Sequence, residues 1–123
     1  MPHIVFGGKI VLEKISENFA PIIMKSESLI KFKEMYLNSN NQSALFSVVV
    51  VDEFHQEFFI QVLTNNKKTT VRLLPVTDPK KTNAVKKSMV LISQIIKNNN
   101  PDLKITKTNL QEYLSPNEIS CKK

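Results

Sequence analysis

The chain has 123 residues, of which 41% are hydrophobic and 23% are charged, and its formal net charge at pH 7 is +6. These values are typical of a globular domain and exclude a disordered chain. With one cysteine, Cys121, an internal disulfide is excluded, and no apolar run reaches the roughly 20 residues that span a bilayer. We expect a single domain over residues 1–114, a flexible tail over residues 115–123, and a cytoplasmic protein that does not insert into membranes.

The N-terminal region predicts a short strand. Residues 4–12 are mostly apolar and rich in β-branched side chains, and the pair Gly7-Gly8 interrupts them. Two glycines suit a tight turn or a close approach of two backbones, so the segment predicts either one strand or a small hairpin. Pro21 then breaks the chain before a helix can run through it.

A first helix is expected from Ser26 or Ser28 through Leu37. Either serine could cap its N-terminus. One face of this helix would be apolar and would consist of Leu29, Ile30, Phe32, Met35 and Tyr36. The polar residues 38–42 would end the helix, and we interpret their asparagines as loop composition without a functional role.

Three strands should follow as an antiparallel meander. Residues 44–51 are nearly all apolar and include four consecutive valines, which predicts a central strand buried on both faces. Residues 54–63 alternate between two faces, and this alternation exposes Phe59 beside polar neighbours. The turn at residues 65–67 leads into a third strand over residues 69–74.

A long helix has the clearest signals. Asp78 is a suitable N-cap, and Pro79 suits the first helical position. Apolar residues then repeat at helical spacing, namely Val85, Met89, Ile92 and Ile96. The helix should end at residues 98–101, and residues 103–105 could form a short strand. The order β-α-β-β-β-α predicts an α+β fold, in which a three-stranded antiparallel meander, with a possible N-terminal strand, carries its helices on one face.

The charge is distributed unevenly along the chain. Residues 1–63 have a net charge of −2, whereas residues 64–107 contain ten Lys or Arg against two acids, a net of +8. A basic block within a folded domain suggests an anionic partner, and we expect nucleic acid, RNA more than DNA. The predicted phosphate-binding residues are Lys67, Lys68, Arg72, Lys80, Lys81, Lys86 and Lys87. The alternative is a solvated basic surface without a ligand.

The principal anion site is expected at the start of the long helix. Lys80, Lys81, Lys86 and Lys87 would crowd its N-terminus, where positive charge opposes the helix dipole. The free N–H groups after Pro79 could bind a phosphate there and reverse this unfavourable arrangement. Changing Lys80, Lys81 and Lys87 to Glu is therefore expected to abolish nucleic-acid binding and to leave the fold intact.

No set of residues matches a catalytic or metal-binding motif. His55 and Glu57 supply two ligands at most, and two ligands do not make a metal site. Gly7-Gly8 lacks the remaining residues of a phosphate-binding loop. Cys121 has no neighbouring histidine that would activate it as a nucleophile. We therefore expect no enzymatic activity, no metal and no cofactor.

Residues 28–97 carry three features of a known family. These are Phe32-Lys33-Glu34-Met35-Tyr36-Leu37, Ala44-Leu45-Phe46-Ser47-Val48, and a Lys-rich final helix that opens with Lys80-Lys81. In these features the chain resembles the small Alu-domain proteins of the signal recognition particle, the nine-kilodalton subunit and its fungal relative. The resemblance implies an α-β-β-β-α fold, a homologous or identical partner subunit, and binding of the particle's RNA through basic residues on the sheet side.

Two functions of different classes are therefore expected to compete. In the first, the protein is a non-catalytic RNA-binding subunit of a larger assembly, a ribonucleoprotein. In the second, it is a protein–protein interaction or dimerisation module, whose exposed sheet face or unpaired strand edge makes the contact. The salt dependence of RNA binding separates the two, because affinity that comes from phosphate contacts falls steeply with salt.

Overall fold

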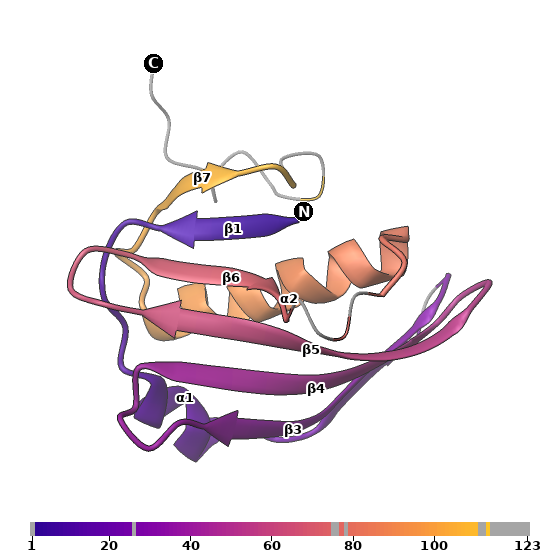
Figure 1. The fold of residues 1–123 in the computed structure, drawn as a ribbon, viewed down its shortest axis with the longest axis horizontal. Helices are drawn as coiled ribbons and strands as arrows, with labels where there is room; N and C mark the ends of the chain where they lie inside the picture. Colours follow the sequence, from indigo (N-terminus) through magenta and orange to yellow (C-terminus); the bar gives the residue numbers. More distant parts are fainter. Residues whose placement is uncertain (1, 26, 75–76, 78, 111–112, 114–123) are drawn as a thin grey trace.

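The protein folds around one antiparallel sheet of seven strands and two helices, as seen in a computed structural model that describes residues 2–25, 27–74, 77, 79–110 and 113 (Figure 1). The strands are β1 (His3–Phe6), β2 (Ile22–Lys25), β3 (Leu29–Leu37), β4 (Ser43–Val51), β5 (His55–Thr64), β6 (Thr69–Leu73) and β7 (Ile105–Thr108). The helices are α1 (Leu12–Asn18) and α2 (Asn83–Asn99). In space the strands follow the order β2-β3-β4-β5-β6-β1-β7.

The two faces of this sheet differ. Helix α2 passes behind the sheet in the view of Figure 1, and both helices pack against strands and against each other. On the helix-covered face the strands place almost fully buried side chains, at most 5% exposed, namely Ile4, Phe6, Ile30, Phe32, Ala44, Phe46, Val48, Val50, Phe58, Ile60, Val62, Val71, Leu73 and Ile105. Val85, Met89, Ile92 and Ile96 of α2 are also fully buried, which confirms the predicted apolar stripe.

The opposite face, called the open face from here on, has no helix over it among the described residues. Its side chains mix apolar with polar types and alternate with the core residues along each strand. On the three central strands the half-buried ones include Leu45, Ser47, Val49, Phe59, Gln61, Leu63, Thr70 and Arg72, whereas Glu57 is exposed. Phe59 lies on this face as its alternation predicted, but it is half-buried and not exposed.

The predicted fold is wrong in its overall form. The predicted strands of the meander are confirmed as β4, β5 and β6, but they form the middle of a seven-stranded sheet. β1 pairs with β6 on one side and with β7 on the other, and β2 and β3 extend the sheet at the far end. The α-β-β-β-α order that the family resemblance implied is therefore not the observed order.

The predicted first helix is a β-strand. β3 occupies Leu29–Leu37 and pairs with β2 and β4. Its register with β4 shifts between Phe32 and Glu34, so one extra residue is accommodated as a β-bulge. The bulge moves the buried side from even to odd positions and creates an apolar spacing of three residues between Phe32 and Met35. Helices produce the same spacing, which is why the pattern was misleading.

Strand β4 also differs from its prediction. It is buried on one face and not on both, because the described helices cover one side of the sheet alone. Phe46, Val48 and Val50 are fully buried, whereas Val49 between them is half-buried and Val51 is 36% exposed. A run of valines therefore does not distinguish a strand covered on one face from a strand covered on both.

Helix α2 begins later than predicted. Its N-cap is Thr82, whose hydroxyl accepts the N–H of Val85 at 3.4 Å, and Pro79 lies before the helix. The predicted N-cap Asp78 lies outside the described residues, as does the predicted tail over residues 115–123.

A short N-terminal strand, β1, ends at Gly7-Gly8, where the chain passes close to the segment before β7. A Cβ atom on Gly7 would lie 2.7 Å from Cγ2 of Thr106, and one on Gly8 would lie 2.7 Å from Cδ1 of Leu103. Both distances are shorter than any normal contact, so a side chain at either position would have to displace the side chain of Thr106 or of Leu103. No hairpin forms here, because the chain continues into α1.

Candidate nucleic-acid interface

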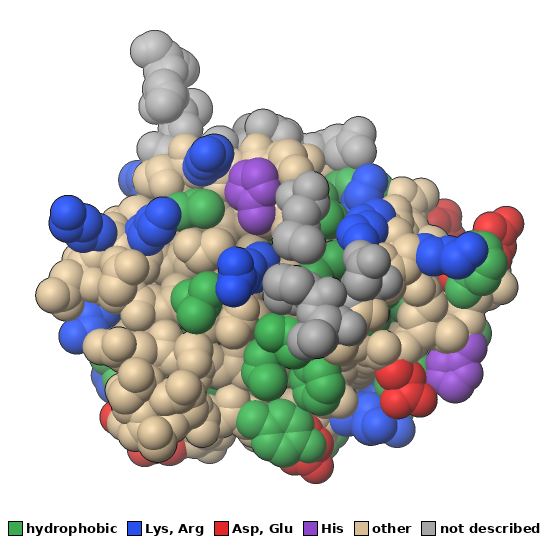
Figure 2. Space-filling model, in the orientation of Figure 1, with side chains coloured by type: hydrophobic (Ala, Val, Ile, Leu, Met, Phe, Trp, Pro, Cys, Tyr) green, Lys and Arg blue, Asp and Glu red, His purple; other side chains and the backbone are tan. Residues whose placement is uncertain are grey.

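The seven basic residues predicted from the sequence do not form one site. Figure 2 looks onto the open face in the orientation of Figure 1. The Lys and Arg side chains are spread over this view, with hydrophobic side chains between them, and are not gathered in a single patch. Local contacts explain the separation. They divide the seven residues into a helix group, Lys80, Lys81, Lys86 and Lys87, and a sheet group, Lys67, Lys68 and Arg72.

Lys80 lies beside the start of β5, in the segment that precedes α2. Its backbone N–H donates to Oε1 of Gln56 at 2.7 Å, and its carbonyl accepts from Nε2 of the same side chain at 3.2 Å. The ammonium group lies 4.4 Å from the centroid of the Phe54 ring, a cation–π contact. Lys80 therefore lies outside the helix and cannot share a helical face with Lys87.

The other three lysines of this group lie in two separate hollows beside α2. Lys81 and Lys86 line one hollow together with Pro2, Asn109 and Leu110. Lys87 lies beside β2 and β3, where its Nζ is 3.6 Å from a carboxylate oxygen of Glu27. The expected anion site at the start of the long helix is therefore divided among three places.

The sheet group behaves differently, because Lys68 and Arg72 share one depression. This polar groove lies where the β3–β4 turn meets the β5–β6 hairpin, and it is lined by Asn40, Gln42, Ser43, Leu63, Thr64, Asn65, Lys68, Thr70 and Arg72. None of these lining residues is an Asp or a Glu. The groove thus combines two cations with neutral hydrogen-bonding groups, a composition that suits an anionic ligand.

The β5–β6 hairpin places Lys67 and Lys68 at its tip. Oδ1 of Asn65 accepts the N–H groups of Lys67 and Lys68 at 2.8 and 3.0 Å, and the N–H of Asn65 donates to the carbonyl of Lys68 at 3.0 Å. These bonds make a tight Asx turn, from which both lysine side chains project into solvent. Lys68 reaches the polar groove, whereas Lys67 extends the positive charge beyond it.

The β3–β4 turn forms the opposite wall of the groove. Asn41 has φ of 60°, a left-handed conformation that Asn tolerates better than most residues. Asn38 and Asn40 each accept a backbone N–H two residues further on, from Asn40 at 2.7 Å and from Gln42 at 3.0 Å. The carbonyl of Gln42 accepts the N–H of Thr64 at 2.9 Å, which joins this turn to the end of β5.

Arg72 is oriented by its neighbour across β5 and β6. Its Nε–H donates to Oε1 of Gln61 at 2.9 Å, and the two residues are directly paired in the ladder. This bond fixes the plane of the guanidinium over the open face. A guanidinium held in this way can offer its terminal N–H groups to a phosphate in a parallel pair of bonds.

An aromatic hollow adjoins the polar groove. It is lined by Tyr36, Leu37, Asn38, Ser43, Ala44, Leu45 and Gln61, and Ser43 belongs to both depressions. Tyr36 is 53% exposed, and its ring meets the Phe59 ring edge to face, with centroids 6.4 Å apart and an interplanar angle of 63°. Tyr36 and Arg72 lie in register on the open face, with Leu45 of β4 and Gln61 of β5 between them.

Most residues of the groove were missed in the sequence. Asn40, Gln42, Ser43 and Asn65 give no charge signal in the sequence, because they are neutral polar residues in or beside turns. The signal that could have found them is the pair of Asn-rich turns placed at the same end of neighbouring strands, which must adjoin in an antiparallel sheet.

The acidic and histidine residues near the β4–β5 turn do not form a metal site. Nε2 of His55 lies 3.7 Å from a carboxylate oxygen of Glu57, and both side chains are more than half exposed. No group of three His, Cys, Asp or Glu side chains that could hold a metal exists among the described residues. The backbone N–H of Phe54 donates to Asp52 at 3.0 Å, and this bond lowers the pKa of the Asp52 carboxyl and stabilises the turn.

Comparison of this chain with models of protein families, with curated proteins and with solved structures finds no match. Neither of the described helices is both long and apolar enough to cross a membrane.

Proposed function

We propose that this protein is a non-catalytic RNA-binding subunit, which holds single-stranded RNA on the open face of its sheet. The observation that carries the proposal is the polar groove, where Lys68 and Arg72 lie together without a carboxylate among the described lining residues, and which Ser43 joins to the hollow of the exposed Tyr36. Proteins that bind single strands combine these same two elements, cations for the phosphates and aromatic faces for the bases.

Each part of the surface has a chemical role in this proposal. Arg72 and Lys68 bind one or two phosphates of the strand. The neutral side chains of the groove, including Asn40, Gln42 and Thr70, can hydrogen-bond to ribose hydroxyls and base edges. A base stacks on Tyr36, whose ring is held by its edge-to-face contact with Phe59. Stacking requires an unpaired base, so the proposal specifies a single strand and not a duplex.

The test is fluorescence anisotropy with a labelled single-stranded RNA over a series of salt concentrations. In the double variant Lys68→Gln/Arg72→Gln, affinity should fall and the slope of log K against log salt should decrease by about 0.7 for each phosphate that the variant no longer binds. In Tyr36→Ala, affinity should fall by about 1–3 kcal/mol, the contribution of one stacked base, with the salt slope unchanged. Weaker binding of a single-stranded DNA of the same sequence would support RNA as the ligand.

The matched control is Lys86→Gln/Lys87→Gln, which removes the same charge from α2 behind the sheet. If this control weakened binding as much as Lys68→Gln/Arg72→Gln, binding would depend on overall charge and not on the groove. If the parent protein bound no RNA at low salt, the RNA-binding function would be rejected. The protein–protein interaction module would then be the better account of the open face.

A further inference from the structure

Strand β2 forms one edge of the sheet and exposes apolar side chains there. Within the described residues it pairs with β3 alone, so the N–H and C=O groups along its outer side have no strand partner. Ile23 is 58% exposed and Met24 is 44% exposed. Exposed apolar edges of this kind are templates for pairing with another strand.

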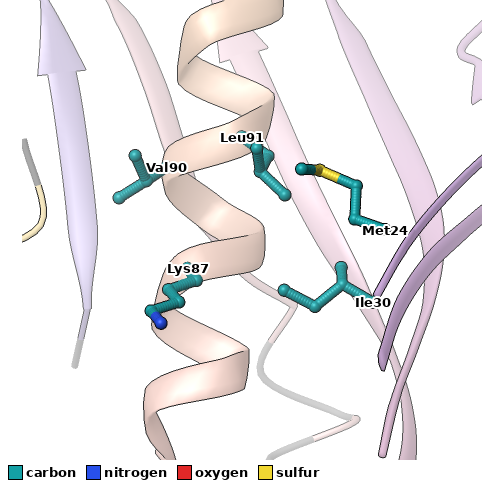
Figure 3. Close-up of a pocket in the computed structure, with 5 residues that line it drawn as sticks. All are labelled: Met24, Ile30, Lys87, Val90 and Leu91. Atoms are coloured by element: carbon teal, nitrogen blue, oxygen red, sulfur yellow. The ribbon is translucent and has the colours of Figure 1, made fainter. Parts of the chain in front are cut away.

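A small apolar depression, the edge hollow, lies beside this strand on the helix side. It is lined by Met24, Ile30, Lys87, Val90 and Leu91, and Figure 3 shows Met24 and Ile30 extending from the sheet toward Leu91 on α2. Lys87 and Val90 precede Leu91 on the same helix. Lys87 is the one charged residue among the described residues of the lining. The edge of β2 thus offers both free backbone groups and an apolar surface next to them.

The other edge of the sheet has a different character. β7 has Thr106 and Lys107 exposed, and Lys104 precedes it, also exposed. Lysines on an edge strand oppose pairing with a second strand, because pairing would bring their charges together or desolvate them. Of the two edges, β2 is therefore the one suited to accept another chain.

We propose that β2 pairs with β2 of a second copy of this chain, in antiparallel orientation about a twofold axis perpendicular to the sheet. A strand paired with its own copy in this way forms a self-complementary interface, the commonest type in homodimers. The two sheets would become continuous, with both pairs of helices on one side and both open faces on the other. This inference does not depend on RNA binding.

The geometry of a twofold axis limits the possible registers. Such an axis places equivalent residues of the two copies on the same face of the combined sheet. Directly opposed residues of an antiparallel pair also share a face. One residue of β2 must therefore lie beside the axis, directly opposite the same residue of the second copy. Within β2 the central candidates are Ile23 and Met24.

Side-chain chemistry selects Ile23. When Ile23 faces its own copy, Ile22 faces Met24 of the second copy, and both belong to the helix side, where they are flanked by Phe32 and Ile30. Every opposed pair in this core of the interface is then apolar.

Charge opposes the other register. When Met24 faces its own copy, Lys25 faces Ile23, and the two Lys25 residues lie about two residue steps, or roughly 7 Å, apart along the strand. With Ile23 at the centre, they lie four steps, or roughly 14 Å, apart, beyond the screening length of about 8 Å at physiological salt. The register with Ile23 opposite Ile23 is therefore favoured.

Disulfide trapping tests the pairing and its register. In a Cys121→Ser background, Ile23→Cys should form a covalent dimer in the presence of oxidised glutathione, since directly opposed residues have Cα atoms roughly 4.5–5.5 Å apart. That separation lies within the range of about 4.4–6.8 Å that disulfides accept. Met24→Cys should cross-link slowly, because the two Met24 Cα atoms would be about 8 Å apart.

Val11→Cys is the matched control for random collision, since Val11 is 47% exposed and lies at the start of α1, not on a sheet edge. The proposal expects Ile23→Cys to dimerise at least tenfold faster than either Val11→Cys or Met24→Cys. If Ile23→Cys were no faster than Val11→Cys, or if Met24→Cys were the fastest of the three, the proposal would be overturned.

Discussion

The helix-covered face and the open face take alternate residues from the same strands, yet they have different physical tasks. Along β4, the side chains of Phe46 and Val48 are fully buried, whereas those of Ser47 and Val49 beside them are half-buried. The covered face removes apolar area from water and thereby stabilises the fold. The open face contributes less to stability, which leaves its residues available for binding. Substitutions on the two faces should therefore have separable effects.

The largest effect is expected for Phe46→Ala on the helix-covered face. Phe46 is 0% exposed, and its ring meets that of Phe19 edge to face, with centroids 5.7 Å apart. Removing the ring leaves a cavity among packed residues, which should lower the free energy of unfolding by about 3–5 kcal/mol. Urea denaturation followed by circular dichroism measures this change. A loss below about 1 kcal/mol would mean that this face is not the stabilising one.

A middle-sized effect is expected for Thr64→Val, which removes one hydroxyl from the covered face. Oγ1 of Thr64 accepts the N–H of Ile10 at 3.1 Å and lies 2.9 Å from Oγ1 of Thr69, which donates to the carbonyl of Gly8 at 2.8 Å. Valine would leave the buried N–H of Ile10 without this acceptor, at a cost of about 1–3 kcal/mol.

The matched control for that substitution is Thr70→Val on the open face. Thr70 lines the polar groove and is half-buried, so its replacement should change the free energy of unfolding by less than about 0.5 kcal/mol. Equal losses from Thr64→Val and Thr70→Val would contradict the assignment of the Thr64 bonds to a buried network. Urea denaturation of the two variants side by side provides the comparison.

The smallest effect is expected for Val49→Thr on the open face, and its neighbour provides the contrast. Val49→Thr should shift the free energy of unfolding by no more than about 0.5 kcal/mol, because a half-buried hydroxyl can still reach water. Val48→Thr makes the same chemical change one residue earlier, at a fully buried position, and should cost about 1–3 kcal/mol. Thermal unfolding of both variants would reveal whether one strand really divides its residues in this way.

Regular periodicity decided which elements could be predicted from the sequence. The strands β4, β5 and β6 and the helix α2 are long enough to show several repeats, and turns or caps with typical residues bound them. β1, β2 and β7 have four residues each, too few to establish a period, so composition alone indicated β1 and a strand near β7, and β2 was not predicted. β3 is long, but its bulge after Phe32 shifts the alternation midway, so its pattern matched a helix.

The candidate site was predictable in part. Charge alone indicated Lys68 and Arg72, but it also indicated Lys80 and Lys87, which the fold places elsewhere. Which cations share a groove depends on how the β3–β4 turn meets the β5–β6 hairpin, and this contact joins segments far apart in the chain. No local pattern contains that information. The ring of Tyr36 was assigned to a helix face because β3 itself was mispredicted.

The position of β1 between β6 and β7 has a consequence for biosynthesis. His3–Phe6 leaves the ribosome well before its two partners, residues 69–72 and 105–108. At bacterial or eukaryotic elongation rates of about 5–20 residues per second, the first strand waits roughly 5 to 20 seconds for its last neighbour. Both of its hydrogen-bonding edges are unpaired until β6 emerges, and the edge that pairs with β7 stays unpaired to the end of that interval. The nascent chain therefore has an open template for wrong pairing until β7 emerges, and a chaperone that binds short apolar strands would act on it there.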